Sequence, residues 1–184
     1  MLRKFFKAYG ANEEDLIFYL KDVNNNDNAQ EVNTRHELFR RYWAFALPYI
    51  WIAHGNEMGH GCFSGRTTSS GDSLNGFFGI GGFSLACVAN NNNARGDLRL
   101  AHSSKERNKE AFDYLYSYKA EIETVLGMQI DWQRSDHTKS SYIVIHLGGV
   151  SIEEEADWTQ MAKFHAEWSK KFYDVFVPYL KQKY

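Results

Sequence analysis

The 184-residue sequence has few cysteines and no excess of charge of either sign. Its two cysteines, Cys62 and Cys87, are too few for a disulfide framework and lack the paired spacing of a zinc site. We therefore expect two reduced, buried thiols. Because 21 Lys and Arg residues stand against 23 Asp and Glu residues, the formal charge of -2 gives no overall attraction for nucleic acid or anionic lipid. Only a local basic face could provide one.

Long apolar runs are also missing. No stretch approaches the roughly 20 apolar residues of a membrane span, and the start of the chain lacks the apolar core and cleavage site of a secretory signal. We therefore expect a cytoplasmic protein with no membrane partner. Hydrophobic residues nevertheless make up 43% of the chain and aromatic residues 16%, which excludes disorder of the whole chain and predicts an aromatic core.

An asparagine-rich stretch divides the chain near its start. Residues 24–28 are four Asn and one Asp, which favour turns and predict a linker. The short apolar run before them, at residues 16–20, predicts a small helix. We therefore expect residues 1–28 to form a helical appendage with its linker, and residues 34–184 to form a single domain.

Three segments of the main domain carry a helix-start pattern, in which a hydroxyl residue is followed three positions later by Glu. The pairs are Thr34 with Glu37, Ser103 with Glu106, and Ser151 with Glu154. We expect the first helix to stop at Pro48 and the second to run unbroken to a cap at Gly127. The third has helical periodicity sustained over about six turns, to the C-terminal lysines.

Short runs typical of strands lie between and after these helices. Before the second helix they are 61–66, 74–80, 83–89 and 97–102, and after it they are 129–134 and 142–147. The last run is nearly continuous in β-branched residues, which is typical of a central strand. The predicted fold class is α+β, a mixed or antiparallel sheet of about five strands with three main helices, in the order α-β-β-β-α-β-β-α.

The helical segments also carry a family resemblance. Its residues are Arg107 to Leu115, Lys119, Glu121 to Glu123, Gly127, Asp131, Trp132, Asp157, Trp158, Val175 and Phe176, with Arg40, Tyr42 and Trp43 in the first helix. This pattern resembles the uncharacterised family called domain of unknown function 4268, over residues 34–180. The resemblance implies a domain that often follows a restriction-endonuclease-like domain, and hence a role in DNA processing or defence beside a nuclease-type protein partner. The family has no established catalytic residues to carry over.

Basic side chains gather on two of the expected helices. From Trp158 onward, five lysines against Glu167 and Asp174 give a local charge of +3. Such a face can contact phosphates while aromatic side chains stack on bases. We therefore expect a non-catalytic accessory module that binds nucleic acid. The expected phosphate contacts are Arg40, Arg41, Lys170 and Lys171. The simpler interpretation is that these lysines are solvated and the aromatic residues form the core.

An enzyme is the alternative, because the expected element order is also that of nuclease domains that hold Mg²⁺ with an Asp and an acidic-x-Lys pair. The nearest match here is Asp72 with Asp97 and Arg99, where Arg replaces Lys and does not release a proton. A divergent Mg²⁺-dependent nuclease would use Asp72 and Asp97. The simpler interpretation is that Asp97 and Arg99 are exposed positions on an edge strand.

Two further patterns are weaker. His54, Glu57 and His60 could bind zinc, but nearby glycines oppose the helix that would fix their geometry, so we expect solvated histidines and no metal.

A protein-interaction module is a further alternative. In that case Trp158, Trp168 and Phe172 would form the docking surface, provided that the sheet does not cover them.

Overall fold

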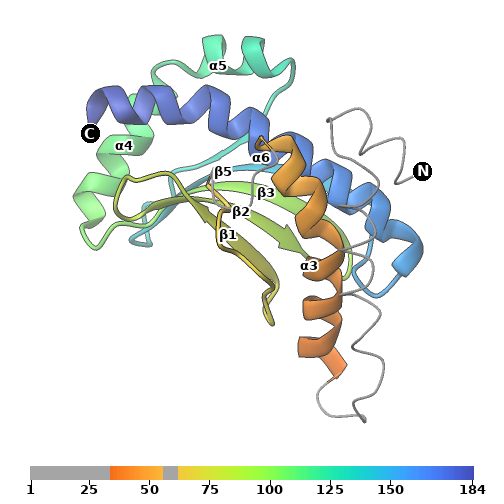
Figure 1. The fold of residues 1–184 in the computed structure, drawn as a ribbon. Helices are drawn as coiled ribbons and strands as arrows, with labels where there is room; N and C mark the ends of the chain where they lie inside the picture. Colours follow the sequence, from red (N-terminus) through yellow and green to blue (C-terminus); the bar gives the residue numbers. More distant parts are fainter. Residues whose placement is uncertain (1–33, 56–61) are drawn as a thin grey trace.

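The structure is a computed structural model that describes residues 34–55 and 62–184 (Figure 1). Its elements are α3 (Thr34–Ala53), β1 (Ser73–Phe77), β2 (Phe83–Ala89), β3 (Asn93–Leu100), α4 (Lys105–Tyr116), α5 (Lys119–Leu126), β4 (Asp131–Gln133), β5 (Ser141–Gly148) and α6 (Glu155–Lys183). The α+β class and the predicted order are confirmed, with the second predicted helix divided into α4 and α5. The predicted appendage and linker, residues 1–28, lie outside the described residues.

The five strands form one antiparallel sheet in the order β1-β2-β3-β5-β4. The central strand is β3, in which Asp97 lies opposite Ala86 of β2 and Val144 of β5. The edge-strand interpretation of Asp97 and Arg99 was therefore wrong. It failed because their charges suggested exposure, whereas strands pair with β3 on both sides along its whole length.

The helices cover one face of the sheet. Figure 1 shows α6, in blue, crossing one side of the sheet, with α3, in orange, beside it. The approach is close at Gly96, where an added Cβ would lie 3.2 Å from Ile145 Cγ2 and 3.7 Å from Trp168 Cβ. We call this the covered face.

The core between α3, α6 and the covered face is aromatic, as predicted. Tyr42, Trp43 and Phe176 are fully buried. Trp158 and Phe172 are buried with them, and Trp168 packs partly buried against this core. The docking surface that these last three residues would have formed therefore does not exist, because the sheet and α3 cover it.

The helix boundaries differ from the sequence prediction at two points. Pro48 does not stop α3, which continues to Ala53. Proline removes its own N–H bond and crowds the carbonyl four residues earlier, but the last turn is held by the burial of Tyr49, Ile50 and Ile52. The second predicted helix breaks at Ser117, whose Oγ donates to the Tyr114 carbonyl at 2.7 Å, so that α5 begins separately.

The predicted caps were correct in part. Helix α3 begins at Thr34, where the pattern placed its start, and Gly127 ends α5 in the left-handed conformation. Helix α4 is capped by Ser104, whose Oγ accepts from Arg107 N at 3.1 Å, one residue after the predicted Ser103. Helix α6 begins at Glu155 without the predicted cap from Ser151. None of the helices within residues 34–55 and 62–184 has the length and apolar character of a membrane span.

Candidate functional site

The second face of the sheet differs from the covered face, because alternate residues of a strand point to opposite sides. No helix of the described residues packs on it. Its residues are Ser73, Asn75, Phe77, Ser84, Ala86, Val88, Asn93, Arg95, Asp97, Arg99, Asp131, Gln133, Tyr142, Val144 and His146. We call this set the open face. Ala86, Val88 and Val144 are buried within it, so its accessible groups are the longer, mostly polar side chains.

Asp97 lies at the centre of the open face between two arginines of its own strand. Its side chain is 0% exposed, whereas the side chains of Arg95 and Arg99 are 35% and 22% exposed. Asp97 Oδ2 accepts hydrogen bonds from Arg95 Nη2 at 3.0 Å and from Arg99 Nε and Nη2 at 3.3 Å. Two guanidinium groups thus share one carboxylate, and the cluster has one positive charge in excess.

The environment of Asp97 explains how this cluster is held. Burial raises the pKa of the Asp97 carboxyl, and the charges and hydrogen bonds of Arg95 and Arg99 act in the opposite direction. The second carboxylate oxygen, Oδ1, faces Arg95 Nε at 3.0 Å, at an angle that gives an ion pair rather than a hydrogen bond. A buried carboxylate between two cations orients both guanidinium groups.

The same cluster is tied to the edge of the sheet. Arg99 Nη1 donates to Asn75 Oδ1 at 3.0 Å, a contact that reaches from β3 over β2 to β1. Arg99 therefore has three of its donors engaged by protein acceptors. Arg95, which is more exposed, is the freer of the two for an external partner.

One row of side chains crosses all five strands of the open face. The strand registers place Phe77, Ser84, Arg99, Tyr142 and Gln133 opposite one another in turn. At the β1 end of the row, the Phe77 ring is 56% exposed. The guanidinium carbon of Arg66, from the loop before β1, lies 4.8 Å from the centre of that ring, a cation–π contact. The row and the adjacent Arg66 thus combine two rings with two guanidinium groups.

The β4 edge of the open face is acidic. Asp131 Oδ2 accepts from Gln133 Nε2 at 2.5 Å and lies 3.7 Å from His146 Nε2. All three side chains are at least partly exposed. The positive groups of the open face therefore lie on its centre and on its β1 side.

The four predicted phosphate contacts occupy two separate places. On α3, Arg40 pairs with Glu37 at 3.5 Å, and Arg41 pairs with Glu155 and lies over Trp158. That contact puts Arg41 beside the first turn of α6. Lys170 follows Glu155 by fifteen residues on α6, which is about 22 Å along a helix, so the structure does not gather the α3 and α6 cations into one patch.

The two lysines also have local partners. Lys170 pairs with Asp174 at 2.5 Å and Lys171 with Glu167 at 2.7 Å, each four residues away on α6. These contacts balance the two lysine charges within the helix surface. Their role as phosphate contacts stays a prediction.

Asp72 and Asp97, the two candidate residues of the nuclease alternative, also lie far from each other. Asp72 is exposed and directly precedes β1, three residues before Asn75, which lies two strands from Asp97. Spacings of about 3.4 Å along a strand and 4.8 Å between strands place their Cα atoms about 14 Å apart. Mg²⁺ binds carboxylate oxygens at about 2.1 Å, so the structure does not bring Asp72 and Asp97 to one ion. Within residues 34–55 and 62–184, no three acidic, His or Cys side chains form a metal-binding group.

His54 is partly buried rather than solvated as predicted. Its Nε2 is 3.0 Å from Ser169 Oγ, and burial lowers its pKa to about 4. Its Nδ1 is 3.8 Å from Cys62 Sγ, whose pKa burial raises to about 12, so this pair is neutral and gives no thiolate. Cys62 and Cys87 are free and buried, as predicted. The other two members of the weak zinc pattern, Glu57 and His60, lie outside the described residues.

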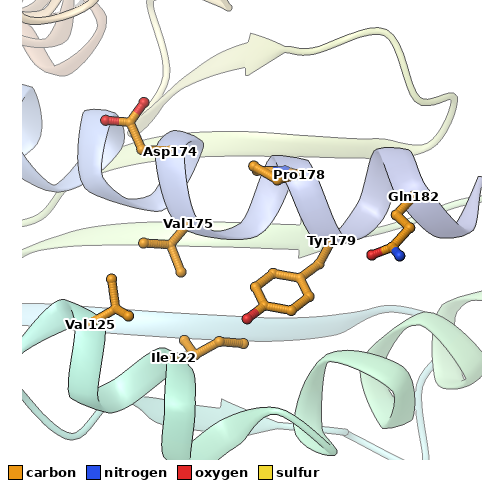
Figure 2. Close-up of a pocket in the computed structure, with 7 residues that line it drawn as sticks. All are labelled: Ile122, Val125, Asp174, Val175, Pro178, Tyr179 and Gln182. Atoms are coloured by element: carbon orange, nitrogen blue, oxygen red, sulfur yellow. The ribbon is translucent and has the colours of Figure 1, made fainter.

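A groove lies between α5 and α6 on the part of the chain that the structure describes (Figure 2). It encloses about 410 Å³ and is lined by Ile122, Val125, Asp174, Val175, Pro178, Tyr179 and Gln182. Val175 and Tyr179 point from α6 toward Ile122 and Val125 of α5. The lining is mostly apolar and lies on the helical side of the molecule, away from the charged cluster of the open face.

Sequence analysis missed most of the open face. It predicted strands at residues 83–89 and 97–102, which left Arg95 between them, and it assigned no role to Phe77 or Tyr142. The available signal was the spacing of Arg95, Asp97 and Arg99 at every second position, which puts all three on one face of a strand.

Comparison with known proteins places the chain in a family without assigning it an activity. No curated protein and no solved structure matches it. The family described as domain of unknown function DUF4268 matches residues 47–180, which is most of the chain and most of the domain described above. Because this match covers more than half of the chain, the chain belongs to the DUF4268 family.

Proposed function

We propose that the protein is a non-catalytic accessory module that binds nucleic acid through the open face of its sheet. The observation that carries this proposal is the cluster at the centre of that face, in which Arg95 and Arg99 share the buried carboxylate of Asp97. The association of the family with DNA processing or defence, and with a nuclease-type protein partner, is part of the same proposal.

The arrangement of the cluster favours binding of a phosphate over simple exposure to water. Guanidinium groups that a fixed carboxylate already orients lose little side-chain freedom when they bind an anion. Their planar donors match phosphate oxygens in a forked geometry. The excess charge of the cluster attracts one phosphate group, and Arg66 supplies a second positive group at the β1 edge.

A polar sheet face also limits the possible partners. The buried centres of protein–protein interfaces are more apolar than the surface around them, whereas nucleic-acid interfaces are polar, positively charged and wet. Away from the acidic β4 edge, the accessible groups of the open face include guanidinium, amide, hydroxyl and aromatic ring groups. These are the groups that contact phosphates and bases in nucleic-acid complexes.

The test is fluorescence anisotropy of labelled DNA titrated with the protein at two salt concentrations, with Mg²⁺ present. Arg95→Gln should weaken binding about tenfold and make the salt slope shallower by about one. Arg99 remains to pair with Asp97 in that variant, so the fold is kept. Equal binding by the wild type and the variant would contradict the proposal. Cleavage of the DNA that Asp72→Ala abolishes would favour the nuclease alternative instead.

A further inference from the structure

We infer that the nucleic acid bound at the open face is single-stranded and that it crosses the strands along the row from Phe77 to Tyr142. This inference rests on the proposed function and gives it a substrate class. It depends on the order of side chains in that row, on the exposure of the Phe77 ring and on the distance that the row covers.

The row places one polar and one charged side chain between two aromatic ones. Phe77 of β1 lies opposite Ser84, Ser84 opposite Arg99, and Arg99 opposite Tyr142 of β5. Three steps of about 4.8 Å separate the two aromatic residues, so they are about 14 Å apart across the sheet. Arg99 lies between them, and Arg95 lies on the same face two residues away. Phosphates can therefore be held between two bases that stack on the rings.

The Phe77 ring already has a planar partner. The Arg66 guanidinium lies over it at 4.8 Å, and more than half of the ring remains exposed. Guanidinium planes and aromatic rings are both surfaces on which an unpaired base stacks. Arg66 and Phe77 together thus provide one stacking position at the β1 edge, next to the charge of Arg66.

Stacking of this kind selects against a duplex. In double-stranded DNA both faces of each base are covered by neighbours that follow at about 3.4 Å, so a side-chain ring cannot reach them. Two rings about 14 Å apart require bases that are unpaired and separated from one another. A duplex could use the arginines alone, whereas a single strand uses the arginines and both rings.

The experiment compares three labelled probes of equal length: oligo(dT), an abasic strand with the same phosphates, and a DNA duplex. The wild type should bind oligo(dT) most tightly. Phe77→Leu and Tyr142→Leu should each weaken oligo(dT) binding about tenfold, the loss typical of one stacked base, and leave binding of the abasic strand unchanged. Unchanged binding of the abasic strand also shows that the variants are folded. Tyr118→Leu, a partly exposed ring between α4 and α5, is the matched control and should bind oligo(dT) like the wild type.

The outcomes separate the inference from the proposed function. If all three probes bind alike and the two ring variants match the wild type, the inference is overturned. In that case an effect of Arg95→Gln would still support a phosphate-binding face. Failure to bind any of the probes would overturn both.

Discussion

The two faces of the sheet differ in the charge of their buried polar groups. On the covered face His165 is completely buried, and burial lowers its pKa to about 4, so it is neutral. Its Nε2 lies 3.0 Å from the Val88 carbonyl and its Nδ1 lies 2.8 Å from the Tyr42 hydroxyl. Because a carbonyl only accepts, Nε2 carries the proton and donates it, and Nδ1 accepts from Tyr42.

On the open face the buried polar group is charged. Asp97 is as deeply buried as His165, but it lies between two arginines whose outer parts reach solvent. Neutral polar groups on the covered face complete the packing of α3 and α6. The charged cluster adds no apolar packing and presents cations outward. The difference indicates which face evolved for packing and which is available for a partner.

Removal of the shared carboxylate should have the largest effect on stability. Asp97→Ala leaves Arg95 and Arg99 close together without their counter-charge and should lower the free energy of unfolding by about 3 to 4 kcal/mol. Urea denaturation measures the loss. Asp131→Ala removes an exposed carboxylate of the same face and should cost less than about 0.5 kcal/mol. Similar losses for the two variants would show that burial of Asp97 has no special role.

Low pH should destabilise the protein through His165 on the covered face. His165 takes up a proton at pH 6.5 when unfolded but only at about pH 4 when folded, so the unfolded state binds more protons between these values. Stability should therefore fall as the pH drops from 6.5 to 4, by up to about 3 kcal/mol from this residue. Urea unfolding over this range measures it. If the free energy of unfolding of His165→Gln fell by the same amount over this range, the loss would be due to other groups.

A smaller effect should follow from loss of one hydroxyl on the covered face. Tyr42→Phe removes the donor to His165 Nδ1 in a fully buried site and should cost about 1 kcal/mol. Tyr142→Phe removes a hydroxyl from a partly exposed residue of the open face and should change stability little, because water can solvate a group in that position. Thermal unfolding of both variants tests this contrast, and a larger loss from Tyr142→Phe would reverse it.

The smallest effect should come from the helix cations. Lys170→Gln breaks only the exposed pair with Asp174 and should change the free energy of unfolding by less than about 0.5 kcal/mol. Chemical denaturation at low and high salt would measure it. A loss above 1 kcal/mol would mean that Lys170 contributes more than a surface ion pair does.

The fold could be predicted from the sequence more fully than the site. Helical periodicity located α3, α4 and α6, and the β-branched run of residues 142–147 identified β5 as an inner strand. The errors fell where tertiary packing overrides a local signal. Helix α3 continues past Pro48 because its last turn is buried. Helix α4 ends before the predicted position, at the hydrogen bond from the Ser117 side chain.

The site depended on information that local patterns do not contain. The alternation of Arg95, Asp97 and Arg99 puts them on one face, but only the placement of α6 shows that this face is not the covered one. The pairing of Lys170 with Asp174 and of Lys171 with Glu167 follows a spacing of four and could have been read from the sequence. The net charge of +3 counted from Trp158 onward therefore did not show that Lys170 and Lys171 each have an acidic partner on α6.

The central claim is that the open face, and not the helix surface, contacts phosphates. Its most direct test compares the salt dependence of DNA binding for the wild type, Arg95→Gln and Lys170→Gln by fluorescence anisotropy. The account predicts a weaker affinity and a salt slope shallower by about one for Arg95→Gln, with Lys170→Gln equal to the wild type. The reverse pattern, with an effect of Lys170→Gln and none of Arg95→Gln, would contradict the account and return the phosphate contacts to the helices.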